Sequence, residues 1–464
     1  MHGTQPLRAA KVAGGALKRR SLLTLPTLCA AVLIVQVDTS VVNLAIQPIG
    51  DYFHAGVGAL QWVMDAYNLF YAVLLLTGGL LADLYGRRLI FMAGTTVFAL
   101  ASLLCTAAPS VSTLIVGRAL AGVGAALLLP ASLAIVRVVW KDERERRRAL
   151  GIWAGCNGMG WAIGPTVGGL LIHSFGWRSI FLIAVPLAAA AFVTARFAIP
   201  ESSDPHGRRF DAGAQVLGAF GLGCLALAAI ESQGNMIVAG IAFVLALLAV
   251  AFFIRIEAGE GAGALVPLDM FRLREFRGAI AATGGMTFGM YGGLFLLTLT
   301  WQSTGRFDAV AAGLALVPMA LVFVVVSPFS GALTGRFGSR LTTAGGVGII
   351  GCGWLLVGFT AHMATVLATE AGLLLTGIGM GLATGPLSSI AVGSVSAARS
   401  GTAAALINVT RMIGATMGVA ILGAVFALAH GGLGGLRIAT LLAGAVQLLS
   451  ALIAWRDTRQ RSVG

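Results

Sequence analysis

The sequence predicts an all-α polytopic membrane protein with fourteen membrane-spanning helices. Of its 464 residues, 58% are hydrophobic and only 11% are charged, whereas soluble globular domains carry about a quarter charged residues. The apolar residues gather in runs long enough to cross ~30 Å of hydrocarbon, which takes about 20 residues per helix. The runs lie at 22–47, 59–81, 89–109, 111–137, 149–173, 178–199, 212–231, 236–255, 278–302, 309–333, 341–361, 365–394, 401–429 and 435–455.

The basic residues predict how these spans are oriented. The net charge of +13 could indicate a nucleic-acid partner, but the positions of the charges favour membrane topology. With the N-terminus inside, only Arg178, Arg306 and Arg437 fall in outside segments, as the positive-inside rule requires. An even number of spans then puts both termini in the cytosol. We expect a multi-pass protein of the cell membrane, such as a bacterial inner membrane, with no nucleic-acid partner.

The beginning of the chain could be mistaken for a secretory signal. Lys18, Arg19 and Arg20 precede an apolar run, as they would in a signal peptide. That run continues past Ala31 to an acid at Asp38, and many further spans follow. We therefore expect a basic cytosolic tail here. The five cysteines all fall inside apolar runs without the spacing of disulfides or metal ligands, so no metal site is predicted.

A short turn between two apolar runs occurs twice. Residues 78–88 read GGLLADLYGRR, and residues 331–340 read GALTGRFGSR. A repeat of this kind indicates a chain built twice. The first residues of the two copies, 78 and 331, lie further apart than the length of the first six-span unit, 22–199. The difference is close to the length of segment 200–277, which predicts two extra helices inserted between two six-helix halves. The expected segments are a tail at 1–21, a bundle at 22–199, an insertion with a surface amphipathic segment at 200–277, a bundle at 278–455 and a cytosolic tail at 456–464.

Three ionisable residues fall at similar depth within predicted spans. Asp38, Asp65 and Arg118 each lie about nine residues or less from the outer end of a span. A carboxylate there is costly to keep charged unless it finds a partner. We predict a proton switch in which Arg118 holds one carboxylate ionised while the other titrates. A permanent structural ion network is the alternative.

The fifth predicted span is rich in glycine. Gly160 and Gly164 lie one turn apart and let a neighbouring backbone approach closely. Pro165 removes a backbone hydrogen bond and permits a bend. The span is therefore either a hinge between the two halves or a site of simple helix packing.

These motifs resemble those of the major facilitator superfamily. The turn has the family's spacing at Gly79, Asp83, Gly86, Arg87 and Arg88. The fifth span is similar to the GxxxGPxxGG antiporter signature of drug exporters at Gly160, Gly164, Pro165, Gly168 and Gly169. The first span looks like the signature of the fourteen-span drug:proton antiporter family at Asp38, Thr39, Val41, Val42 and Asn43.

The resemblance implies the major facilitator fold, with two six-helix bundles, and export driven by protons. The turn would be a gating loop and the glycine motif a hinge. Two departures weaken details of the likeness. Ala121 stands where the family's fourth-span pattern has Gln after the arginine, and Gly335 stands where the second turn would have Asp.

Candidate substrate contacts combine aromatic, polar and charged residues of the predicted spans. Aromatic walls with acids would suit hydrophobic cations. For Arg411 two roles stay open: pairing with an acid in a closed state, or holding helices together. The candidates are Asn43, Tyr67, Asn68, Tyr71, Trp161, Tyr291, Phe295, Gln302, Glu370, Asn408 and Arg411.

The sequence predicts a transporter and not an enzyme. None of its three lysines follows the glycines of an ATP-binding phosphate loop, so the proton gradient is the expected energy source and no cofactor is expected. We predict a monomeric antiporter that exports hydrophobic, cationic small molecules by alternating access. Export of an endogenous metabolite or lipid-like compound is the alternative within transport. A membrane-embedded enzyme or a sensor is the remote alternative, because the histidines lie far apart in sequence.

Overall fold

The computed structural model consists of helices and short connections over the residues that it describes, which are 5–203, 212–232, 235–260, 266–361, 366–396 and 399–458. In chain order the helices are α1 (Gln5–Phe53), α2 (Val57–Tyr85), α3 (Arg87–Thr106), α4 (Val111–Val139), α5 (Glu143–Phe175), α6 (Ser179–Leu182), α7 (Ala184–Ala198), α8 (Ala212–Glu231), α9 (Met236–Glu260), η2 (Leu268–Arg272), α10 (Arg274–Ser303), α11 (Ala309–Val326), η3 (Ser327–Phe329), α12 (Ser330–Phe337), α13 (Ser339–Thr360), α14 (Val366–Gly393), α15 (Ser400–Leu428) and α16 (Gly432–Asp457).

The predicted all-α membrane fold is confirmed. Within the described residues, 13 helical spans are long and apolar enough to cross a membrane. The helix α5 is the fourteenth; it runs unbroken for 33 residues, and some of its side chains lie outside the described set. The first helix is longer than predicted, because it continues back through the expected tail to Gln5.

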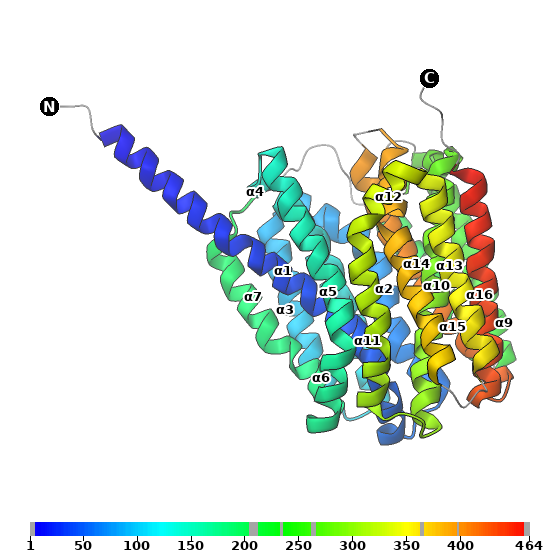
Figure 1. Cartoon of the computed structure of the whole chain (residues 1–464). Helices are drawn as coiled ribbons and strands as arrows, with labels where there is room; N and C mark the ends of the chain where they lie inside the picture. The colour runs from blue at the N-terminus through cyan, green and yellow to red at the C-terminus, as the bar shows by residue number, and fades with distance from the viewer. Residues whose placement is uncertain are drawn as a thin grey trace.

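The spans form two bundles with an extra helix pair (Figure 1). In the first bundle, α1 packs with α5 and α7, and α4 packs with α2 and α3. In the second, α10 packs with α15 and α16, and α14 packs with α11 and α13. Helix α8 pairs with α9 and contacts both α2 and α15, so the extra pair touches both bundles. Both termini lie at one end of the molecule (Figure 1), here called the terminal face; the other end is the opposite face.

Glycines set the close packing within each bundle. A Cβ on Gly94 of α3 would lie 2.9 Å from the carbonyl oxygen of Gly124 of α4, and the reverse distance is the same. The second bundle repeats this arrangement, since a Cβ on Gly353 of α13 would lie 2.5 Å from the carbonyl oxygen of Gly372 of α14. Helices in lipid associate through such backbone approach because no hydrophobic force drives them together.

Prolines interrupt two of the predicted spans. The sixth is divided into α6 and α7 at Ile183, because Pro186 has no N–H with which to bond the carbonyl of Leu182. The tenth turns through η3 at Pro328 before α12. Before α10, the predicted surface amphipathic segment contains the short helix η2, and the basic residues from Arg274 open α10 itself.

The two bundles are joined by contacts in the half of the molecule nearer the opposite face. Gln61 of α2 donates to the carbonyl oxygens of Val419 and Ala420 of α15, at 2.9 and 3.0 Å. Thr298 of α10 donates to the carbonyl oxygen of Asn43 of α1 at 3.1 Å. These bonds connect the two bundles on that side.

Candidate functional site

A buried ion pair lies at the centre of the first bundle. Arg118 of α4 donates through Nη1 to Asp38 Oδ2 of α1 at 2.6 Å, and the two residues are only 1% and 4% exposed. The Nε atom of Arg118 donates to the carbonyl oxygen of Val63 of α2 at 3.1 Å. Three helices are thus tied together by one guanidinium, whose charge the carboxylate of Asp38 neutralises.

Tyr67 of α2 completes the surroundings of this pair. Its ring centroid lies 4.5 Å from the guanidinium carbon of Arg118, which is a cation–π arrangement. The hydroxyl of Thr39 donates to the Tyr67 hydroxyl at 3.4 Å. Tyr67, predicted as a substrate contact, therefore serves the ion pair in this conformation.

Asp65 is placed differently from what a three-membered network would require. It is 0% exposed, yet neither carboxylate oxygen has a hydrogen-bond partner among the described residues. Asp65 follows Gln61 by one helical turn and so lies on the same face of α2, the face that meets α15 of the second bundle. An ionised carboxylate without a partner is costly in such a position, so the surroundings tolerate the neutral acid best.

The glycine motif of α5 contacts both bundles. On one face, Gly160 and Gly164 pack against α1: a Cβ on Gly160 would lie 2.5 Å from Gln36 Cβ, and one on Gly164 would overlap the Ser40 hydroxyl. Gly168 lies on the same face, where an added Cβ would be 2.7 Å from Val41 Cγ1. The face therefore packs directly on the segment of α1 that carries Asp38.

The other face of the motif meets α11 of the second bundle. A Cβ on Gly169 would lie 3.0 Å from the carbonyl oxygen of Ala309. The carbonyl oxygen of Pro165 approaches Gly313 so closely that a Cβ there would lie 2.5 Å from it. One helix thus touches both halves, as the hinge prediction requires, although it also provides tight packing.

The predicted gating loop is bound to the end of α7. Arg87 donates to Asp83 Oδ1 through Nε at 3.1 Å and Nη2 at 2.9 Å. The backbone N–H groups of Arg88 and Leu89 donate to the carboxylate of Glu201 at 3.0 and 3.2 Å. Gly86 has φ of +117°, which favours glycine. Sequence reasoning missed Glu201, which caps α3 from a distant segment; its position directly after Pro200 gave no sign of this partner.

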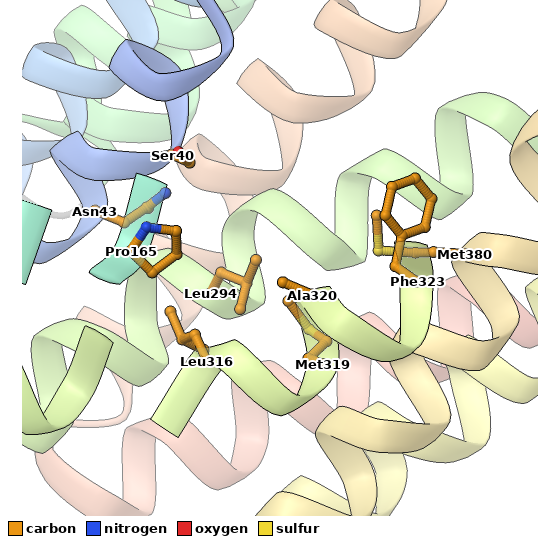
Figure 2. A pocket seen from close by; sticks show the side chains of 9 residues that line it. All are labelled: Ser40, Asn43, Pro165, Leu294, Leu316, Met319, Ala320, Phe323 and Met380. Atoms are coloured by element: carbon orange, nitrogen blue, oxygen red, sulfur yellow. The ribbon is translucent and has the colours of Figure 1, made fainter. Parts of the chain in front are cut away.

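Between the bundles lies a pocket that both halves line (Figure 2). Of the predicted contacts, Asn43 lines it. The remaining walls are mostly aliphatic and sulfur side chains, in contrast to the expected aromatic ones. The lining residues are Ser40, Asn43, Pro165, Leu294, Leu316, Met319, Ala320, Phe323 and Met380.

The other predicted contacts lie in different surroundings. Phe295 is fully buried in the core. Asn68, Gln302 and Glu370 each have buried polar atoms without a hydrogen-bond partner in the described part of the chain. Asn408 donates to the Ala404 carbonyl of its own helix at 3.0 Å. The side chain of Trp161 lies outside the described residues. The remaining three are Tyr71, Tyr291 and Arg411, which lie near one another, since the charge of Arg411 acts on both tyrosines.

The comparisons with known proteins fit this architecture. The family model of the Major Facilitator Superfamily matches residues 28–419. The chain belongs to the Major Facilitator Superfamily. It is therefore a membrane transporter and not an enzyme. The superfamily match runs from α1 through the extra helix pair and into α15.

Relatives within the superfamily include drug-resistance proteins. The chain is 34% identical over 414 residues to multidrug resistance protein Stp of Mycobacterium tuberculosis, covering 89% of this chain and 77% of that one. It is 32% identical over 432 residues to a methylenomycin A resistance protein of Bacillus subtilis, covering 91% of each. It is 31% identical over 409 residues to multidrug efflux pump LfrA of Mycolicibacterium smegmatis, covering 88% and 81%.

A solved structure supports the superfamily fold. The crystal structure of the POT family transporter PepTSo matches with a TM-score of 0.70, covering 93% of this chain and 96% of that chain. The sequence identity is 15%, so the likeness concerns the fold alone.

The Gln61 contact yields the first testable expectation for this superfamily member. Replacing Gln61 by Ala removes two hydrogen bonds between the bundles, each contributing about 0.5–1.5 kcal/mol. We expect the opposite face to open more often. Spin labels at Gly56 and Gly434, which both have open space around them, would report longer and broader distances than in the unsubstituted protein.

The control is Gln47→Ala, because among the described residues the Gln47 side chain bonds to Asp51 of its own helix, at 2.8 Å. It should leave the distance distribution unchanged. Identical distributions for Gln61→Ala and Gln47→Ala would show that the Gln61 contact does not hold the bundles together.

Proposed function

We propose that this transporter is a proton-coupled antiporter that exports hydrophobic, cationic small molecules from the cytosol by alternating access. The observation that carries the proposal is the contrast between two buried acids. Asp38 is held by Arg118 at 2.6 Å, whereas Asp65 is buried without a hydrogen-bond partner in the described part of the chain. Relatives named as a multidrug resistance protein and a multidrug efflux pump support export as the direction of transport.

In the proposed cycle the two acids have separate tasks. Asp38 stays ionised and keeps α1, α2 and α4 together through Arg118. Asp65 gives up its proton when a cationic substrate arrives, because the substrate then supplies the missing positive partner. A proton from the other side later displaces the substrate from Asp65. Substrate and proton thus compete for one carboxylate, which couples their opposite movements.

Alternating access requires the bundles to rock about α5 and α11. The bonds of Gln61 and Thr298 would hold one side shut while the pocket is loaded from the terminal face. We propose that the terminal face is cytosolic, since the chain's Arg and Lys residues concentrate in the loops assigned to that side. The outward step then breaks the contacts on the opposite face and releases the substrate.

The test is gradient-driven accumulation of ethidium in everted membrane vesicles with an acidic interior. We expect accumulation with the unsubstituted protein and its loss with Asp65→Asn, because the neutral amide cannot exchange a proton. Asp51→Asn is the matched control, since Asp51 is exposed and bonded within its own helix. Full accumulation with Asp65→Asn would refute the proposed proton coupling.

A further inference from the structure

One guanidinium between the bundles, that of Arg411, pairs with no carboxylate of the described residues. Arg411 of α15 takes part in none of the ion pairs found among the described residues, and its buried Nε atom has no hydrogen-bond partner there. Its charge acts on Tyr71 of α2 and Tyr291 of α10. The side chain of Arg411 is partly accessible, so part of it can be reached by a bound molecule.

The register of the helices gives the depth of Arg411. Gln61 of α2 bonds to Val419 and Ala420 of α15, and the two helices run in opposite directions. Ten residues beyond Gln61, about 15 Å along the helix, comes Tyr71. Counting back a similar distance on α15 from Val419 and Ala420 reaches Arg411. This agrees with the effect of the Arg411 charge on Tyr71. Arg411 therefore lies near the middle of the membrane, where the two bundles face each other.

A guanidinium at that depth needs a partner, since an unpaired charge inside the membrane is costly. Other arginines of the structure meet this need within the protein. Arg118 bonds Asp38 inside the first bundle. At the terminal face, the more accessible Arg277 and Arg399 bond Asp457 and Asp269. Like Arg118, which lies over the ring of Tyr67, Arg411 lies near tyrosines, but among the described residues no acid pairs with it.

We propose that Arg411 is a binding site for an anionic group of the transported molecule, a carboxylate in the first instance, flanked by Tyr71 and Tyr291. The planar guanidinium can bind a carboxylate through two parallel hydrogen bonds. The inference rests on the proposed transport function and extends it. With Asp65 on α2 receiving a cationic group, the favoured substrate is an amphipathic zwitterion that has an apolar body, an amine and a carboxylate.

Two dyes that differ only in this group provide the test. Rhodamine B carries a free carboxylate, and its ethyl ester keeps the cationic ring system without it. Binding of each dye to the full-length protein in lipid nanodiscs is measured by fluorescence anisotropy. We expect tighter binding of the acid than of the ester. Arg411→Gln should weaken binding of the acid about tenfold or more, as expected for loss of a charged hydrogen bond. It should leave binding of the ester unchanged.

Two further variants sharpen the result. Arg411→Lys keeps the positive charge but lacks the two parallel N–H donors of the guanidinium. It should retain an intermediate preference for the acid. Arg437→Gln removes an exposed arginine at the opposite face and should change the binding of neither dye. Equal weakening of both dyes by Arg411→Gln, as a purely structural role would give, overturns the proposal, and so does an unchanged affinity for the acid. Since binding needs no gradient, failure of proton coupling would not affect this outcome.

Discussion

Replacing Asp38 by Asn is expected to abolish gradient-driven efflux and to lower the thermal stability of the protein. The substitution leaves the guanidinium of Arg118, which is 1% exposed, without a charged partner in the middle of the first bundle. Breaking a buried ion pair from one side costs about 3–5 kcal/mol. Thermal unfolding of the purified protein, followed by intrinsic fluorescence, measures the loss.

The double variant Asp38→Asn with Arg118→Gln is the decisive companion. Removing both charges leaves no isolated ion, so we expect it to regain much of the stability that either single substitution loses. Transport should remain absent. Arg87→Gln is the control, because its pair with Asp83 is more accessible and should contribute about 1 kcal/mol or less. Additive losses in the double variant would show that the pair is not an energetic unit.

Replacing Gly164 by Val is expected to reduce transport at least as severely as any other single change in α5. A Cβ at this position would overlap the Ser40 hydroxyl, which itself donates to the Gly160 carbonyl at 3.3 Å. Overpacking of this kind costs about 1–3 kcal/mol, and relieving it pushes α1 away from α5. Because Asp38 lies half a turn from Ser40, its alignment with Arg118 should suffer too.

The comparison for this experiment lies on the same helix. Gly155 has nothing within 4 Å of an added Cβ, so Gly155→Val makes the same chemical change without the clash. Ethidium efflux from whole cells, normalised to the amount of protein in the membrane, should fall about tenfold or more for Gly164→Val and stay near normal for Gly155→Val. Similar activities in the two variants would mean that α1 and α5 need not be in close contact for transport.

The sequence predicted the spans because lipid imposes strict rules. A charge inside a span needs a partner, so depth grouped Asp38, Asp65 and Arg118 but left open which acid pairs with the arginine. Depth could not separate Asp65 from them, since the side on which an acid faces depends on which helix packs there. Gln61, one turn before Asp65, bonds to α15, which lies in the other half of the chain.

Contacts between distant segments were beyond reach of the sequence for the same reason. Glu201 caps α3 and Gln61 bonds two carbonyls of α15, yet neither lies in a repeated or charged pattern. The pocket also differed from expectation. Tyr67 was the natural aromatic wall, but it packs over Arg118, and Leu316 and Met319 of the apolar span α11 line the pocket.

The central claim is that Asp65 exchanges a proton for substrate while Asp38 stays paired with Arg118. Proton release on addition of ethidium to the purified protein, followed with a pH-sensitive dye in weakly buffered solution, tests it most directly. The account predicts release from the unsubstituted protein and none from Asp65→Asn. Undiminished release from Asp65→Asn would contradict it.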